Sequence, residues 1–218
     1  VREAARARQV LREIAPHLTR RTGFLLRTRS AACLAKFRTA MWTFEKLGKV
    51  PKEDHHEVLD FDDLLEQEPL AATEGTTGAV RYIEFVTDDS RLTLANARSA
   101  ASHGGLILTY APAVEFIFEN EVVVGVRVES VLEGESLGAT IRAKAVINAA
   151  GPWVDSVRSL EDPDEPDYLS ITKGVHLVLP HKRLPLNDTI LLTAIDKRSI
   201  FAVPRGDTTC LLYTSDAA

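Results

Sequence analysis

Three residues with very small side chains, Ala149, Ala150 and Gly151, directly precede Pro152. The apolar residues 145–147 before them predict a short buried strand. A proline suits the first turn of a helix because its missing N–H is not needed there. A strand, a tight turn and a helix start would let the backbone approach a flat or anionic ligand, with free N–H donors nearby. The same pattern also suits a corner that is packed tightly for structural reasons alone.

A histidine, His176, lies within a predicted strand over residues 168–179. Because side chains alternate along a strand, Gly174 and His176 share one face. The glycine leaves room for a ligand against the backbone. A neutral imidazole beside that ligand could accept a proton. The alternative is a histidine that only satisfies a structural hydrogen bond.

Other residues that often carry chemistry are not arranged for it. His55 and His56 are adjacent in an acidic segment, and neighbouring histidines rarely bind one ion without further ligands. We therefore predict a solvated loop there and no metal site. The two cysteines, Cys33 and Cys210, make no disulfide framework, which favours a reducing, cytoplasmic setting.

Charge is distributed unevenly along the 218 residues. Residues 1–52 contain 13 Lys and Arg against 3 Asp and Glu, a net charge of +10, whereas the rest carries −15. A basic segment can address an anionic membrane surface, nucleic acid or the protein's own acidic half. We expect no nucleic-acid partner, because no recognised motif or aromatic-rich stripe accompanies the charge. No run is long and apolar enough to cross a bilayer.

The order of the predicted elements indicates a mixed α/β fold. Helices are expected over residues 3–14, 31–47, 60–68 and 91–103. Strands are expected over residues 24–26, 79–86, 106–108 and 168–179, with a three-stranded meander over 114–118, 122–131 and 139–147 and a hairpin of 189–195 and 200–204. Helix, strand, meander, strand, small-residue turn and helix follow the order of the second half of a dinucleotide-binding flavoprotein domain.

Four runs occur in an order that one family shares: TDDSRLTLANARSAASHGG, VINAAGPWVDSVR, TKGVHLVLP and DKRSIFAVPRGDTT. Together they resemble the FAD-dependent glycerol-3-phosphate dehydrogenases, of the D-amino-acid oxidase-like flavoprotein superfamily. The resemblance covers most of residues 1–209. It implies a mixed α/β fold made of a partial FAD-binding domain with a three-stranded β-meander, part of an antiparallel-sheet substrate domain, and N-terminal helices.

The resemblance also implies a division of the chain. Residues 1–78 would form a helical, basic segment on the substrate and membrane side. Residues 79–160 would be the second half of the FAD-binding domain, and residues 161–209 part of the substrate-binding sheet. We interpret the last run, CLLYTSDAA over 210–218, as read-through of a sequencing adapter, because the family would continue its strand differently there.

The implied activity is oxidation of sn-glycerol 3-phosphate to dihydroxyacetone phosphate by hydride transfer to FAD. Electrons would pass to a quinone, with the enzyme peripheral on the cytoplasmic, inner face of the plasma membrane. Alternatives are a glycerol-3-phosphate oxidase or another amine or hydroxy-acid oxidoreductase of the same fold. An alternative of another class is a non-catalytic module that binds a membrane surface or a partner.

Carried over by position, the resemblance assigns seven site residues: Ala113 and Val114 beside the adenine, Ala150, Gly151 and Trp153 near the flavin, His176 as the catalytic base and Arg198 as a substrate-binding residue. Two features of the family are missing from this sequence. No glycine-rich phosphate loop of the G-x-G-x-x-G kind is present, and neither are the family's later phosphate-binding arginines. We therefore expect an internal fragment that neither holds FAD tightly nor turns over.

Overall fold

The computed structural model describes residues 2–134, 138–193 and 198–215. The chain divides into two compact units. The first contains residues 1–95 and 173–218, and the second contains residues 96–172. Each unit is described by itself below.

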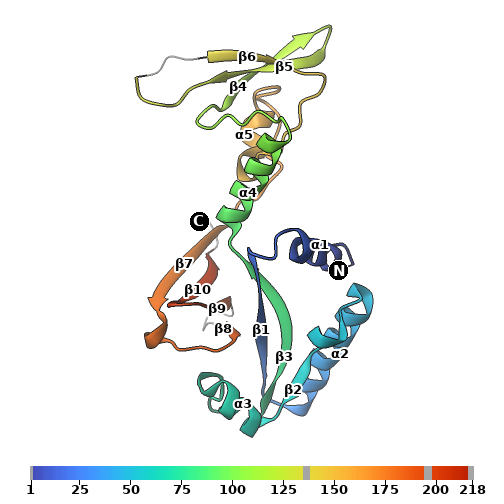
Figure 1. Ribbon diagram of the computed structural model, residues 1–218, viewed down its shortest axis with the longest axis vertical. Helices are drawn as coiled ribbons and strands as arrows, with labels where there is room; N and C mark the ends of the chain where they lie inside the picture. The colour runs from blue at the N-terminus through green and yellow to red at the C-terminus, as the bar shows by residue number, and fades with distance from the viewer. Residues whose placement is uncertain (1, 135–137, 194–197, 216–218) are drawn as a thin grey trace. The chain divides into compact units, whose positions relative to one another are not determined.

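A seven-stranded mixed sheet forms the centre of the first unit, in the order β2-β3-β1-β8-β9-β10-β7 (Figure 1). Its strands are β1 Thr19–Thr28, β2 Glu57–Leu59, β3 Gly78–Thr87, β7 Lys173–Pro180, β8 Thr189–Thr193, β9 Ser199–Arg205 and β10 Thr208–Ser215. β1 and β8 are parallel, whereas the other neighbouring pairs in this order are antiparallel. The predicted hairpin is confirmed as β8 and β9. The sheet also confirms the mixed α/β fold class.

The longest pairing joins β1 to β3 over ten residues of each, from Thr19 opposite Thr87 to Thr28 opposite Gly78. The sequence predicted only residues 24–26 of β1, because its first half is polar. Pairing along the full length of β3 satisfies the backbone groups of that polar half and holds it in the sheet.

Three helices accompany this sheet: α1 Arg2–Ile14, α2 Ala31–Gly48 and α3 Phe61–Gln67. The hydroxyl of Ser30 accepts a hydrogen bond from the Cys33 amide at 3.2 Å and caps α2. The Asp60 carboxylate caps α3 in the same way, at 2.9 Å from the Asp63 amide. These side chains satisfy N–H groups that the first helical turn leaves free. Short 3₁₀ turns lie at Lys52–Asp54, Pro69–Ala71 and His181–Arg183.

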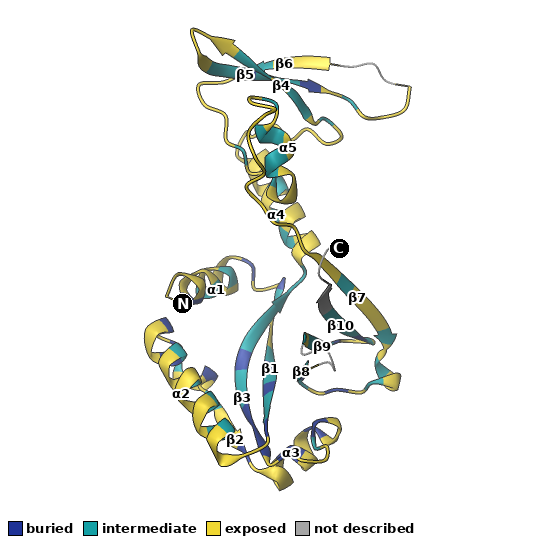
Figure 2. Cartoon of the chain, turned by 180° about the vertical axis from the view of Figure 1, so that it is seen from behind, coloured by how far each residue is buried: buried dark blue, intermediate teal, exposed yellow. Residues whose placement is uncertain are grey.

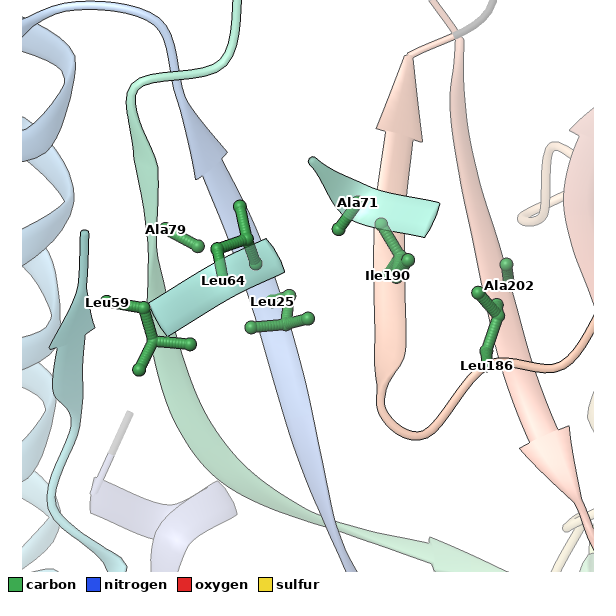
Figure 3. Close-up of a cluster of buried hydrophobic side chains, with 8 residues drawn as sticks. All are labelled: Leu25, Leu59, Leu64, Ala71, Ala79, Leu186, Ile190 and Ala202. Carbon is green, nitrogen blue, oxygen red and sulfur yellow. The ribbon is translucent and has the colours of Figure 1, made fainter. Parts of the chain in front are cut away.

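The core of the first unit lies between α3 and one face of the sheet (Figure 3). Leu64 of α3 is fully buried, and it joins Leu25, Ile190 and Ala202 from three adjacent strands. The cluster is completed by Leu59, Ala71, Ala79 and Leu186. Burial of these apolar side chains is what fixes α3 against the sheet.

The segment KEDHHE is only in part the solvated loop that we predicted, because four of its six residues are exposed whereas Asp54 is buried and His56 is half-buried. Glu45 of α2 is buried, and its carboxylate accepts hydrogen bonds from the His56 amide at 2.5 Å and from the His56 ring at 2.8 Å. A buried carboxylate requires such partners. The sequence did not predict this contact, because Glu45 belongs to a different element, α2. Within the described residues no cluster of metal-ligating side chains forms.

The second unit contains a three-stranded antiparallel meander of β4 Ala113–Glu119, β5 Val122–Glu129 and β6 Gly138–Arg142. It also contains the second half of α4 Asp89–Ser102, a 3₁₀ turn at Gly151–Trp153, and α5 Val154–Arg158. α4 has no buried residue, as its colouring in Figure 2 makes plain. The predicted meander is confirmed, although its last strand is shorter than expected.

Two predicted strands of this unit, over residues 106–108 and 145–147, are wrong. Both segments are irregular, and Leu106 and Ile147 are 80% and 87% exposed. A strand requires a neighbour to receive its backbone hydrogen bonds. No strand in the described part of the chain pairs with either segment. The strand over 168–179 is also shorter than predicted, since β7 begins at Lys173.

Candidate cofactor-binding site

A cavity of about 500 Å³ lies within the second unit. β4 and β5 contribute Phe116 and Val126 to it, and Trp153 and Val157 come from the segment around α5. The remaining lining residues are Pro112, Ala113, Val146, Ile147, Asn148, Ala149, Ala150 and Ser156. The wall is therefore mainly apolar and aromatic, with an amide and a hydroxyl as its polar side chains. Such a wall suits a flat, largely apolar group.

The turn formed by Ala149, Ala150 and Gly151, which we call the small-residue corner, is not covered by other side chains at Gly151. Gly151 has a φ of +57°, a conformation that a residue with a Cβ adopts only under strain. A Cβ built on Gly151 would meet no atom within 4 Å, and the neighbouring Ala149 is exposed. The corner is thus free of packed side chains and leaves its backbone accessible to a ligand.

The bend of this corner is held by Asn148, a residue that the sequence analysis did not single out. Its side-chain oxygen accepts a hydrogen bond from the Ala150 amide at 3.1 Å. Its side-chain nitrogen donates to the Val154 carbonyl at 3.0 Å. One amide therefore ties both ends of the turn together. The asparagine immediately before the small residues was the available signal, because asparagine commonly bonds to nearby backbone groups in turns.

Asp155 of α5 binds the segment that follows this helix in the chain. Its carboxylate accepts a hydrogen bond from the Leu169 amide at 2.8 Å and from Arg158 at 2.9 Å. The backbone hydrogen bond from Leu169 is the main reason that the pKa of Asp155 lies below its ordinary value, with smaller contributions from Tyr168 and Arg158. The Arg158 guanidinium also lies 5.6 Å from the centre of the Tyr168 ring.

The structure gathers three of the five predicted cofactor-binding residues in this cavity. Ala113, Ala150 and Trp153 line it, and Trp153 is 68% exposed. Gly151 lies between two of them in the turn. Val114 follows Ala113 on β4 but does not line the cavity. Their predicted role toward adenine and flavin remains a proposal.

The predicted substrate residues belong to the first unit. His176 is exposed on β7, opposite Leu212 of β10. The preceding residue of β10, Leu211, packs on the core cluster, so the His176 side chain lies on the other face of the sheet. A Cβ on Gly174 would meet nothing within 4 Å, which leaves space beside His176. Arg198 directly precedes β9.

Comparisons with known proteins agree with this architecture. The chain is 36% identical to the aerobic glycerol-3-phosphate dehydrogenase of Staphylococcus epidermidis over 209 residues, which is 94% of this chain and 37% of that protein. It matches the crystal structure of the glycerol-3-phosphate dehydrogenase of Bacillus halodurans, complexed with FAD, with a TM-score of 0.78 and 34% identity over 97% of this chain and 37% of that one.

Proteins of lower sequence identity share the fold. The L-alpha-glycerophosphate oxidase of Mycoplasma pneumoniae, with FAD bound, matches with a TM-score of 0.64 at 14% identity, over 98% of this chain and 56% of that one. The chain spans 37% of the length of the curated relatives it matches. The profile of FAD dependent oxidoreductases matches residues 1–218. The chain therefore belongs to the FAD dependent oxidoreductase family.

Proposed function

We propose that the chain is part of a flavoenzyme that oxidises sn-glycerol 3-phosphate to dihydroxyacetone phosphate. The observation that carries this proposal is the 36% identity to a glycerol-3-phosphate dehydrogenase over 94% of the chain. The substrate is taken from the names of such relatives, and the open corner in the second unit supports the cofactor. The predicted division into regions 1–78, 79–160 and 161–209 belongs to the same proposal.

The residues of the second unit fit an FAD. A mainly apolar cavity of about 500 Å³ with an exposed Trp153 suits a flat ring system. The open backbone at Gly151 permits close approach, because a larger residue there would fill that space. Ala113, Ala150 and Trp153 would contact the group. When bound, FAD supplies an acceptor for the hydride that leaves C2 of the substrate.

His176 is our proposed base. Loss of hydride from C2 is assisted when the proton of the adjacent hydroxyl is removed, and the imidazole would accept that proton at a ring nitrogen. Its exposure and the open space at Gly174 leave it accessible to a small polar molecule. Arg198 is our proposed contact for the negatively charged substrate.

The proposal is tested on the complete enzyme, with the flanking sequence restored. Purified protein should be yellow and should be bleached anaerobically by glycerol 3-phosphate. His176→Ala should lower kcat by 10²-fold or more while flavin stays bound, since a positioned base contributes about that much. Colourless protein would overturn the cofactor assignment. Unchanged turnover in H176A would leave His176 as a packing residue.

The electron acceptor and the location are the finer parts of the proposal. We propose a quinone acceptor and a peripheral position on the cytoplasmic face of the plasma membrane, supported by the net charge of +10 over residues 1–52. No helix in the described ranges has the length and apolarity to cross a membrane. Reduction of a quinone without release of peroxide would support a dehydrogenase, whereas peroxide formation would indicate an oxidase.

A further inference from the structure

Two arginines between the end of β1 and the start of α2 lie beside a second cavity, in the first unit. This cavity measures about 320 Å³. Arg27, near the end of β1, and Arg29, in the connection to α2, both line it. Its other walls are mainly apolar and consist of Leu26, Cys33, Phe37, Leu191 and Thr193.

The two guanidinium groups have no carboxylate partner among the described residues. Arg27 donates a hydrogen bond to the Thr73 hydroxyl at 2.8 Å. Neither arginine takes part in an ion pair within those residues, whereas Arg21 of β1 and Arg81 of β3 do. Arg21 contacts Asp54 at 2.7 Å, and Arg81 contacts Asp188 at 2.5 Å.

The electrostatic consequence is visible at Arg27. The pKa of its guanidinium is lowered, first by burial and second by the positive charge of Arg29. At Arg81 the carboxylates of Asp188 and Glu57 outweigh burial, and its pKa is raised. Arg27 is partly buried and Arg29 is exposed, and an anion that neutralises both charges would relieve their mutual repulsion. The first turn of α2 also contains no acidic residue that could do so.

We propose that Arg27 and Arg29 form a binding site for a phosphate group. Two planar guanidinium forks match the oxygens of a phosphate, which carries more negative charge at neutral pH than a carboxylate does. Leu26, Phe37 and Leu191 would contact a short carbon chain attached to that phosphate. The ligand class is therefore a phosphate ester, either a small soluble molecule or the headgroup of an anionic lipid. This site is independent of the redox activity proposed above.

The test uses the 218-residue chain and titrates it with inorganic phosphate at constant ionic strength, with chloride as the control anion. We expect saturable NMR shifts at the side-chain N–H groups of Arg27 and Arg29. Arg29→Gln should weaken the phosphate affinity at least tenfold, which corresponds to about 1.4 kcal/mol. Arg98→Gln changes the net charge equally at an exposed position of α4 and should leave the affinity within twofold.

A second arm distinguishes the two sources of phosphate, by sedimentation with phosphatidylglycerol or phosphatidylcholine vesicles. Loss of phosphatidylglycerol binding in R29Q, with R98Q unchanged, would identify a lipid headgroup. Vesicle binding that is equal in all three chains, together with loss of phosphate binding in R29Q, would identify a small soluble ester. Phosphate shifts that do not saturate, or equal weakening by R29Q and R98Q, would overturn the site.

Discussion

Glu68 is a carboxylate that is held almost entirely away from solvent. It is 1% exposed, and one of its oxygens accepts hydrogen bonds from the Asn187 amide at 2.6 Å and the Asp188 amide at 3.0 Å. The other oxygen has no partner among the described residues. Burial is the main reason that the pKa of Glu68 is raised, and the negative charge of Asp188 adds to it. The side chain thus ties the start of β8 to the end of α3 while carrying a charge that burial opposes.

This balance predicts a pH dependence. An acid whose pKa is raised by folding favours the folded state most below its ordinary pKa, and that contribution is lost as the pH rises through the raised pKa. Glu68→Gln keeps an accepting oxygen and removes the charge, so its free energy of unfolding relative to wild type should increase between pH 4 and pH 7. Glu68→Ala removes both hydrogen bonds and should cost about 2–3 kcal/mol at neutral pH. Urea unfolding at several pH values measures both, and a pH-independent difference between E68Q and wild type would contradict the argument.

Gly151 provides a second test at the scale of one residue. Gly151→Ala forces a Cβ into a left-handed conformation and should cost about 1–2 kcal/mol in the free energy of unfolding. Gly206→Ala is the matched control, because Gly206 has a φ of +64° and an equally open surrounding. The two variants should lose similar stability. In the complete enzyme only G151A should weaken FAD binding, as measured by flavin retention, and equal retention would place the corner away from the cofactor.

Among the elements, α3 offers the sharpest contrast between neighbouring positions. Leu64 is 0% exposed in the core cluster, whereas Leu65 is 47% exposed. Leu64→Ala leaves a cavity between α3 and the sheet and should cost about 2–5 kcal/mol. Leu65→Ala removes the same atoms from the surface and should stay within about 0.5 kcal/mol. Chemical denaturation of the two chains compares them directly, and similar losses would mean that α3 is not docked as described.

The sequence predicted elements well where the signal is local. α2 follows the spacing of Leu34, Phe37, Met41 and Phe44, and α3 follows an Asp that caps its start and a Pro that succeeds it. The meander follows from alternating valines. The candidate site was predictable to the same extent, because Ala150, Gly151 and Trp153 are neighbours in the sequence.

Elements that depend on distant partners were not predictable. The polar half of β1 becomes a strand because it pairs with β3, which lies more than 50 residues later. Residues 145–147 have the composition of a strand and yet have none of the neighbours that a strand requires among the described residues. His56 is tied to Glu45 by a contact that no local pattern encodes.

For the molecule as a whole, the second unit carries apolar residues that the described chain does not bury. Leu106 and Ile147 are examples, in segments with strand-like composition. We propose that further sequence of the complete enzyme covers them, together with the bound cofactor at Ile147, in keeping with the 37% share of the relatives that this chain spans.

The variant Ile147→Ser tests whether Ile147 is buried in the complete enzyme. In the 218-residue chain the change should alter the free energy of unfolding by no more than about 0.5 kcal/mol, because the side chain is 87% exposed. In the complete enzyme it should cost about 2–5 kcal/mol, the range for truncating a buried isoleucine. Thermal or urea unfolding of both proteins gives the comparison. Equal effects would mean that Ile147 stays at the surface.

The strand β10 overlaps residues 210–218, the run that we interpret as adapter sequence. β10 includes Cys210 and pairs with both β9 and β7. We propose that residues 210–218 nevertheless derive from an adapter, on the strength of their sequence. Reading the source DNA beyond codon 209 tests this directly. A continuous gene that encodes CLLYTSDAA would refute it.

Asn148 gives the corner its shape before any ligand arrives, since both ends of its amide are already engaged within the folded chain. Because this turn is already ordered, it loses little conformational freedom when FAD binds. Binding of FAD should then show a single kinetic phase whose rate is proportional to the FAD concentration. The variant Asn148→Ala removes both hydrogen bonds, and it should add a slower phase whose rate does not depend on the FAD concentration.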